Sequence, residues 1–324
     1  MRVGSNPTGP TGLAVATLGV AGCAGPANLP SALPAPLAKP SYDEAVRGIR
    51  ATIAQDAADP VLAATALPRL YEHGHRTENA VLMFHGFTNS PQQFDLLARQ
   101  FHARGCNVYV MRIPRHGHKD RLTHVLADLT GHELAASGLE AYRLASGLGN
   151  RITALGLSLG GSMALWLAQA QPLDLAVPIS PFLMPIGLGR TIGTVAMRAV
   201  YTLPSIYVWW DPRLKEKCLP DYAYPGFPSH ALAVVTFFGD GIFQFAGSVK
   251  PLGKRCVVVL NQNESAVNNS ITRSLVEGWQ KGGAPYEIDV LTGLGPPRHD
   301  IIDPTTFPEG VKLVYPKLEQ IVLG

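Results

Sequence analysis

The sequence has few charged residues, few cysteines and no long apolar run, and each shortage excludes a class of protein. Asp, Glu, Lys and Arg make up 16% of the 324 residues, and 27 basic against 24 acidic side chains leave a net charge of +3. No basic block is present, so we expect no nucleic-acid partner. No apolar run reaches the ~18–20 residues that cross a bilayer, which excludes a polytopic membrane protein. The hydrophobic content of 46% is enough to bury a full core, which excludes a disordered chain.

The four cysteines do not form a pattern typical of a disulfide scaffold or a metal site. Cys23 lies near the start of the chain, and Cys106, Cys218 and Cys256 remain. Three is an odd number, so a full framework is excluded, although one pair could be bridged. No C-x-x-C, H-E-x-x-H or G-x-G-x-x-G spacing is present. We therefore expect no metal, nucleotide or flavin, and hence no cofactor.

From about residue 42 the chain alternates short apolar runs with helical periods, which predicts an α/β fold with a mostly parallel sheet flanked by helices. The expected strands cover residues 80–84, 107–113, 152–157, 173–179, 256–260 and 286–291. The expected helices cover residues 133–147, 162–170, 270–280 and 309–322. Aromatic residues, prolines and glycines interrupt the pattern at about 181–250. We interpret that segment as a cap inserted between the fourth and fifth strands.

The stretch Gly156-Leu-Ser158-Leu159-Gly-Gly161 follows the third expected strand and precedes a helix. Small glycines permit the strained turn that exposes a serine hydroxyl, and the amide of Leu159 then opens the helix. His85-Gly86-Phe87-Thr88 closes the first expected strand. The amides of Phe87 and Leu159 are therefore candidate donors to one oxyanion. We expect His85 to brace its loop rather than to take part in chemistry.

A serine nucleophile needs a base and an acid. Of the ten histidines, only His230 and His299 follow Ser158, and His230 lies inside the expected cap, so His299 is the predicted base. Glu264 is the only carboxylate in the loop after the strand at 256–260 and is the predicted acid. Asp300, Asp240 and Asp289 are the alternatives, and Glu264 could instead be a solvated loop residue.

These motifs together resemble the α/β-hydrolase superfamily, and within it bacterial carboxylesterases and monoacylglycerol lipases. The resemblance rests on HGFT, on PRHGH at 114–118, on GLSLGG, on N-E-x-x-V and on HDIIDP, and it runs from about residue 78 to the end. It implies Ser158 as nucleophile, His299 as base, and Phe87 and Leu159 as oxyanion donors. One position departs from the family, which usually has Asp where this chain has Glu264. The resemblance gives the PRHGH loop a structural role.

Residues 1–22 resemble a bacterial lipoprotein signal peptide. A short apolar stretch ends in Val20-Ala-Gly-Cys23, and the resemblance implies a lipid on Cys23 and a place in the bacterial cell envelope. The alternative is a misassigned start, which would leave the protein in the cytoplasm. Residues 23–41 are rich in Ala and Pro and are expected to be a tether. Residues 42–324 are then the hydrolase domain.

The predicted function is a serine carboxylic ester hydrolase with a Ser-His-Glu triad. Its partner is a small ester, either a short- to medium-chain acyl ester or a monoacylglycerol, because the aromatic cap segment favours apolar acyl groups. A peptidase or amidase of the same fold is the nearest alternative. A non-catalytic surface lipoprotein is the alternative from another class.

Overall fold

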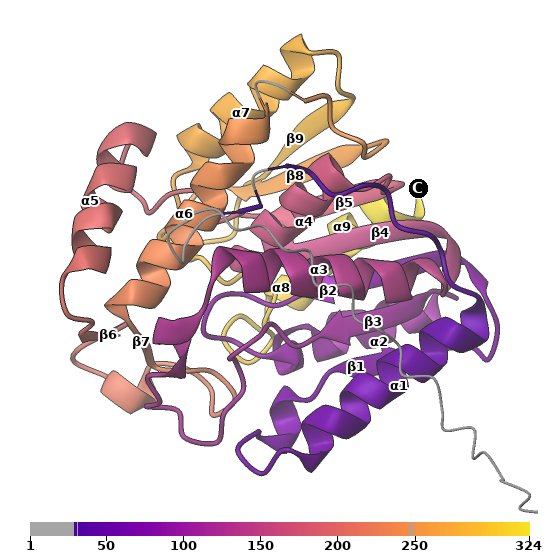
Figure 1. Ribbon diagram of the computed structural model, residues 1–324, viewed down its shortest axis with the longest axis horizontal. Helices are drawn as coiled ribbons and strands as arrows, with labels where there is room; N and C mark the ends of the chain where they lie inside the picture. The colour runs from indigo at the N-terminus through magenta and orange to yellow at the C-terminus, as the bar shows by residue number, and fades with distance from the viewer. Residues whose placement is uncertain (1–28, 31, 247–248) are drawn as a thin grey trace, which may run out of the picture.

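The computed structural model in Figure 1 describes residues 29–30, 32–246 and 249–324. The predicted signal peptide and the lipidation residue Cys23 lie outside these residues. The three cysteines inside them, Cys106, Cys218 and Cys256, are all free thiols.

A seven-stranded sheet forms the centre of the molecule, in the order β1-β3-β2-β4-β5-β8-β9. Its strands are β1 (Arg69–Tyr71), β2 (Thr77–Phe84), β3 (Asn107–Met111), β4 (Gly149–Leu157), β5 (Leu175–Ile179), β8 (Cys256–Asn261) and β9 (Tyr286–Leu291). All neighbours are parallel except β1, which runs antiparallel to β3 at one edge. The predicted fold class is thereby confirmed. The short strand β1 was not predicted, because three half-buried residues carry no clear alternation.

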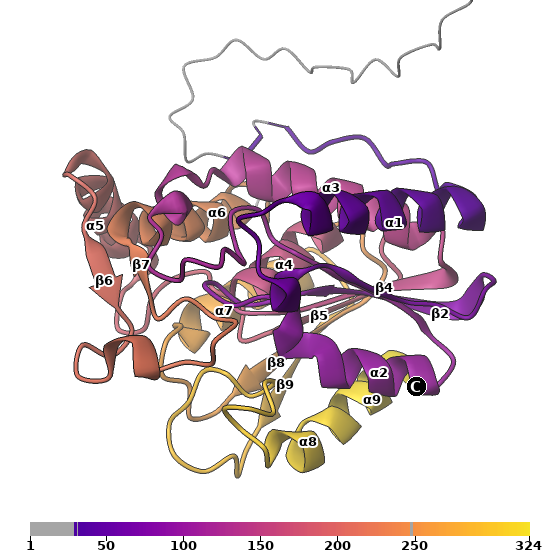
Figure 2. The same cartoon turned by 90° about the horizontal axis from the view of Figure 1, so that it is seen from below.

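Helices cover both faces of the sheet (Figure 2). The α-helices are α1 (Tyr42–Ala58), α2 (Asp95–Ala103), α3 (Gly131–Ser146), α4 (Leu159–Ala170), α5 (Arg190–Thr202), α6 (Ser229–Ala246), α7 (Asn269–Lys281), α8 (Gly310–Leu313) and α9 (Tyr315–Leu323). Apolar residues of α1, α3, α4, α6 and α7 share one buried cluster with one side of the sheet. Residues of α2 and α9 form a second cluster with the other side. A parallel sheet needs this cover because both of its faces are apolar.

The segment at 181–250 contains α5, a two-stranded sheet of β6 (Tyr207–Trp209) and β7 (Gly226–Pro228), and α6. Helix α5 and strands β6 and β7 lie at one end of the molecule in both views (Figures 1 and 2). Helix α6 differs from them, because Val234, Val235 and Phe238 are buried in the same cluster as α3 and α4. The assignment of the whole segment as a cap stays a prediction.

The described part of the expected tether packs on the domain. Leu29 is buried, and Leu33 and Leu37 lie against the main core. The amide of Leu37 donates to Oε1 of Gln171 at 2.9 Å, and Nε2 of Gln171 donates to the carbonyl of Ala35 at 3.3 Å. The leucines recur every fourth residue and give this proline-rich stretch an apolar side. The expectation of a free tether is therefore wrong for this part.

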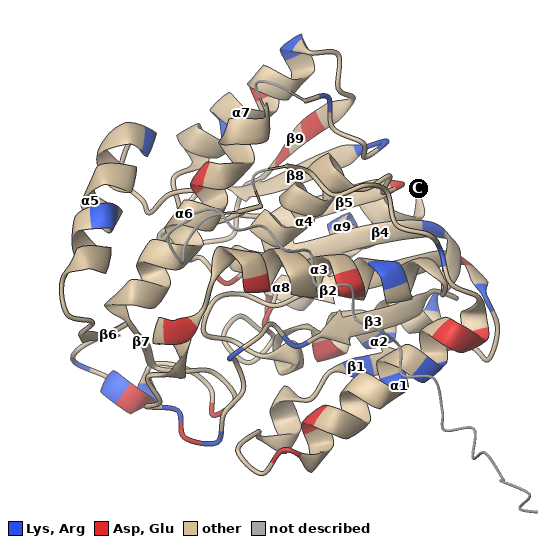
Figure 3. Cartoon of the chain, viewed as in Figure 1, with Lys and Arg blue, Asp and Glu red and all other residues tan. Residues whose placement is uncertain are grey.

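Charged residues of both signs are interspersed over the described surface, as the blue and red segments of α1 illustrate (Figure 3). Within the described ranges no helix is both long and apolar enough to cross a membrane.

Candidate active site

The turn between β4 and α4 holds Ser158 in a strained conformation. Its φ of 59° and ψ of −117° lie where non-glycine residues are rare. The end of β5 fixes this turn, because the Ser158 amide donates to the carbonyl of Ile179 at 2.9 Å and its carbonyl accepts from the amide of Phe182 at 3.0 Å. The side chain is buried but not sealed, with 4% of the residue exposed. The sequence prediction of a strand-to-helix turn at this serine agrees with the fold.

Gly160 lets the loop after β2 lie directly against this turn. A Cβ on Gly160 would meet the Phe84 carbonyl oxygen at 2.1 Å and the His85 carbonyl oxygen at 2.7 Å. Both are backbone atoms that cannot move aside. The amide of Phe87 in that loop and the amide of Leu159 donate to no other group among the described residues. Two free amides beside a buried serine are what an oxyanion site requires.

Two buried histidines brace the Phe87 loop and take no part in any triad. His85 pairs through Nδ1 with the Gly86 carbonyl at 2.9 Å, and its Nε2 accepts from the Ile113 amide at 3.0 Å. His116 accepts from the Thr88 amide at 3.2 Å. Burial lowers the pKa of His116 to about 4 and holds the pKa of His85 well below its usual value. Both rings are therefore neutral at pH 7 and serve as fixed hydrogen-bond partners.

Glu264 and His299 meet, although 35 residues separate them. Oε1 of Glu264 lies 2.8 Å from Nδ1 of His299, and the same oxygen accepts from the amides of Ser265 and Ala266 at 2.8 Å each. The Glu264 side chain is only 3% exposed, which excludes a solvated loop residue. Burial pushes the pKa of Glu264 upward, but the hydrogen bond and charge of His299 and the Ala266 amide outweigh it and leave the pKa lowered.

Ser180 is a contact of Glu264 that the sequence did not reveal. Its hydroxyl lies close enough to the carboxyl group to help lower the pKa of Glu264. Ser180 Oγ and Glu264 Oε2 are nevertheless both buried without a partner at full hydrogen-bond geometry. A serine directly after β5 is the only sequence signal that could have indicated it.

The three alternative acids are engaged elsewhere. Asp240 pairs with Arg190 at 2.5 Å and Asp289 with Lys317 at 3.0 Å. The Asp300 carboxylate accepts from Gln93 Nε2 at 2.7 Å and from two backbone amides. Of these four carboxylates, Glu264 is the one that contacts His299. Among the described residues no hydrogen bond joins His299 to Ser158, although both follow the carboxyl ends of parallel strands at one edge of the sheet.

The segment at 181–250 contacts the Phe87 loop through Thr88. Trp210 Nε1 donates to Thr88 Oγ1 at 2.9 Å, and the Tyr224 amide donates to the Thr88 carbonyl at 2.7 Å. The ring centroids of Trp210 and Phe227 are 4.7 Å apart, and those of Phe87 and Phe227 are 5.3 Å apart. Aromatic rings of this segment therefore pack against the Phe87 side chain.

A model of the Alpha/beta hydrolase family matches residues 81–309, which is well over half of the chain. This chain belongs to that family. The match spans the Phe87 loop, Ser158, Glu264 and His299.

Several of the proteins to which this hydrolase is similar are lipases or lipolytic enzymes. It is 34% identical over 94 residues to the thermostable monoacylglycerol lipase of Bacillus sp. (strain H-257), a match that covers 28% of this chain and about a third, 36%, of that enzyme. Among solved structures, a member of the metagenome-derived lipolytic pair LipS and LipT superposes with a TM-score of 0.61 at 20% identity, covering 81% of this chain and 100% of the other. The monoacylglycerol lipase of Paleococcus ferrophilus gives 0.55 at 15% identity, covering 78% and 98%. At these identities the superpositions show the fold.

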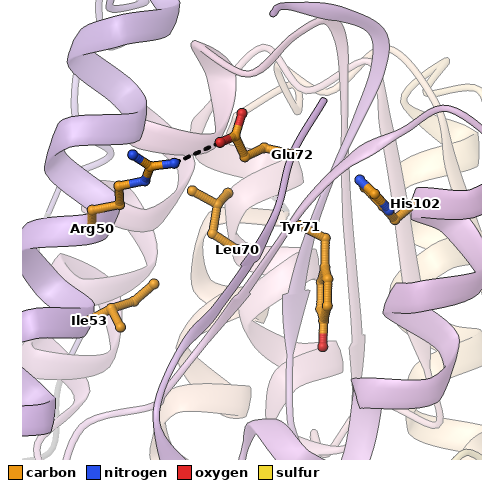
Figure 4. Close-up of a pocket in the computed structure, with 6 residues that line it drawn as sticks. All are labelled: Arg50, Ile53, Leu70, Tyr71, Glu72 and His102. Atoms are coloured by element: carbon orange, nitrogen blue, oxygen red, sulfur yellow. Dashed lines mark hydrogen bonds and ion pairs between the residues drawn. The ribbon is translucent and has the colours of Figure 1, made fainter. Parts of the chain in front are cut away.

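This hydrolase has a surface pocket of about 390 Å³ (Figure 4). Its lining includes Arg50 and Glu72, which form an ion pair at 2.8 Å, beside Tyr71 and His102. Tyr71 pairs with Val108 near the start of β3, whereas Ser158 follows the end of a strand parallel to β3. The pocket is therefore at the opposite edge of the sheet. No group of three potential metal ligands occurs within the described ranges.

Proposed function

We propose that this α/β hydrolase is a serine carboxylic ester hydrolase that acts on short- to medium-chain acyl esters or monoacylglycerols. The observation that carries the proposal is the 2.8 Å contact between buried Glu264 and His299, at the same edge of the sheet as the strained Ser158. A carboxylate on Nδ1 fixes the tautomer that leaves Nε2 free to accept a proton.

The proposed reaction has two halves. Ser158 Oγ attacks the ester carbonyl carbon while His299 Nε2 takes its proton, and the oxyanion accepts hydrogen bonds from the amides of Phe87 and Leu159. His299 then protonates the leaving alcohol, which leaves an acyl group on Ser158. A water molecule that gives its proton to His299 attacks this acyl-enzyme. The bond between the acyl carbon and Ser158 Oγ then breaks, His299 returns the proton to Oγ, and the acid departs. The approach of His299 to Ser158 belongs to the substrate complex, since catalytic hydrogen bonds are often long without substrate.

The aromatic rings of Phe87, Trp210 and Phe227 support an apolar acyl or alkyl group as the recognised part of the substrate. A monoacylglycerol lipase among the relatives supports the same class.

The test is Ser158→Ala, measured with p-nitrophenyl esters from acetyl to dodecanoyl. Loss of the hydroxyl should reduce kcat by about 10⁴-fold or more, because the residual rate comes from binding and the oxyanion donors alone. A fluorophosphonate probe should label the wild type and not the variant. Appreciable ester hydrolysis by Ser158→Ala contradicts the assignment of Ser158 as nucleophile. Faster cleavage of amides than of matched esters by the wild type indicates a peptidase or amidase. Absence of probe labelling in folded wild type indicates a non-catalytic lipoprotein.

We also propose that Cys23 carries a lipid that holds the protein at the bacterial cell envelope. Because Leu29 is buried against the domain, only the five residues 24–28 lie between the anchor and the packed chain. At ~3.5 Å per residue, the six steps from Cys23 to Leu29 then hold Leu29 within about 20 Å of the membrane surface. Incorporation of labelled palmitate by the wild type and not by Cys23→Ser tests this, and equal incorporation contradicts it.

A further inference from the structure

Gln93 joins the two loops on which the proposed chemistry depends. It lies in the short helix at Pro91–Phe94 that precedes α2, and its side chain is buried, with 1% of the residue exposed. Oε1 of Gln93 accepts from the Gly86 amide at 2.7 Å, and Nε2 donates to Asp300 Oδ2 at 2.7 Å. Gly86 immediately precedes Phe87, and Asp300 immediately follows His299. One side chain therefore spans two loops that are far apart in the sequence.

Both ends of this bridge are fixed. Asp300 Oδ1 accepts from the amides of Ile302 and Asp303 at 3.0 Å each, so the carboxylate cannot rotate without losing them. The Gln93 amide cannot turn over, because its nitrogen would then face the Gly86 amide, donor against donor. Only a side chain with an acceptor at one end and a donor at the other satisfies both loops.

We propose that Gln93 is a positioning residue that aligns the Phe87 oxyanion loop with the His299 loop. This inference rests on the proposed esterase function. The base and the oxyanion donors act on the same ester carbonyl at the same moment, so their relative position matters more than that of either loop alone. A misplacement of about 1 Å in such an arrangement can cost about a hundredfold in rate. Substrate binding through apolar contacts does not depend on this alignment.

The bridge can be tested by reversing its polarity. Gln93→Glu keeps the acceptor for the Gly86 amide, but the new carboxylate then faces the carboxylate of Asp300. Asp300→Asn keeps Oδ1 for the two amides but sets two donors against each other. Each single change should lower kcat about ten- to a hundredfold with KM changed less than about threefold. The double variant Q93E/D300N sets a carboxylate acceptor against an amide donor, which restores the hydrogen bond, so kcat should return to within about fivefold of the wild type.

The same change at the neighbouring position supplies the control. Gln92 accepts from Arg69 at 2.6 Å and has no hydrogen bond to either loop among the described residues, so Gln92→Glu should keep the wild-type kcat. Thermal melts show whether each variant is folded, and Gln93→Met replaces Gln93→Glu if that variant does not fold. The methionine variant has neither donor nor acceptor and should lose kcat to the same extent.

The outcomes separate this inference from the function on which it rests. Recovery of kcat in the double variant supports the bridge. The role of Gln93 is overturned if the wild type hydrolyses esters and both single variants have the same kcat as the wild type. It is also overturned if the double variant has a kcat no higher than that of the less active single variant. Neither result contradicts the esterase function. A wild type without hydrolysis of any ester overturns both.

Discussion

The variant Glu264→Asp tests how strongly kcat depends on the distance between the carboxylate at position 264 and Nδ1 of His299. The family that this chain resembles usually has aspartate here, yet the fold places the longer side chain 2.8 Å from His299 Nδ1. Removing one methylene withdraws the carboxylate by about 1.3 Å. At an effective dielectric constant of about 20, the attraction to the imidazolium formed in the transition state falls from about 5.9 kcal/mol to about 4.0 kcal/mol. The loss of about 2 kcal/mol corresponds to about a 25-fold lower kcat.

The assay is the kcat and KM of p-nitrophenyl butyrate hydrolysis, with thermal melts to show that the variant is folded. Glu264→Gln removes the charge entirely and should reduce kcat by about 10³- to 10⁴-fold. Glu277→Asp makes the same shortening at an exposed position of α7 and should leave kcat unchanged. A Glu264→Gln enzyme with nearly wild-type kcat would refute the assignment of the acid. Full activity of Glu264→Asp alone would refute the distance argument.

Two further predictions concern stability. Gly160→Ala places a methyl group against the carbonyl oxygens of Phe84 and His85. We expect it to lower the free energy of unfolding by about 3 kcal/mol and Tm by about 5–10 °C. As a control, Gly278→Ala on α7 places its methyl group in open space and should not lower Tm. For Asp303, burial and the neighbouring Asp300 raise its pKa from 3.8 to about 6, so the folded state binds this proton more tightly than the unfolded state. Protonated Asp303 therefore adds up to about 3 kcal/mol to the free energy of unfolding below about pH 4, and this contribution is lost as pH rises to about 6. Urea unfolding at several pH values in this range should show that the free energy of unfolding declines less in Asp303→Asn than in the wild type. Equal declines in the two proteins would disprove the link.

The sequence was sufficient for the strands of the parallel sheet, because each is a buried apolar run that ends at glycine, proline or a polar loop. Helix α1 was not predicted, since its alanine-rich pattern has little amphipathic contrast. Its capping box was available as a signal, because Ser41 accepts from the Glu44 amide and Glu44 accepts from the Ser41 amide. A capping box depends on local spacing and can be recognised without any tertiary contact.

Some parts of the candidate site could likewise be predicted from the local sequence, and others could not. The Ser158 turn follows from local glycine spacing, and the choice of Glu264 followed from its being the only acid in its loop. The Gln93 bridge could not be predicted, because a buried glutamine gives no sign of which distant loops it will join. Nor could the packing of Leu29 be predicted, since it depends on a surface of α6 that receives the Leu29 side chain beside Gly241.

The position of the segment at 181–250 bears on how such an enzyme can diversify. The chain leaves the sheet after Ile179 and re-enters at Cys256, and these residues belong to strands that pair directly, β5 with β8. Because β5 and β8 run parallel, the chain has to cross back from the carboxyl end of β5 to the amino end of β8, and the buried helix α6 lies on this return path. Helix α5 and the β6–β7 hairpin come before α6, so they can lengthen, shrink or be exchanged without altering strand pairing. Only α6, which is buried against α3 and α4, must be retained. New substrate preferences can thus arise by replacing one contiguous stretch while Ser158, Glu264 and His299 keep their places.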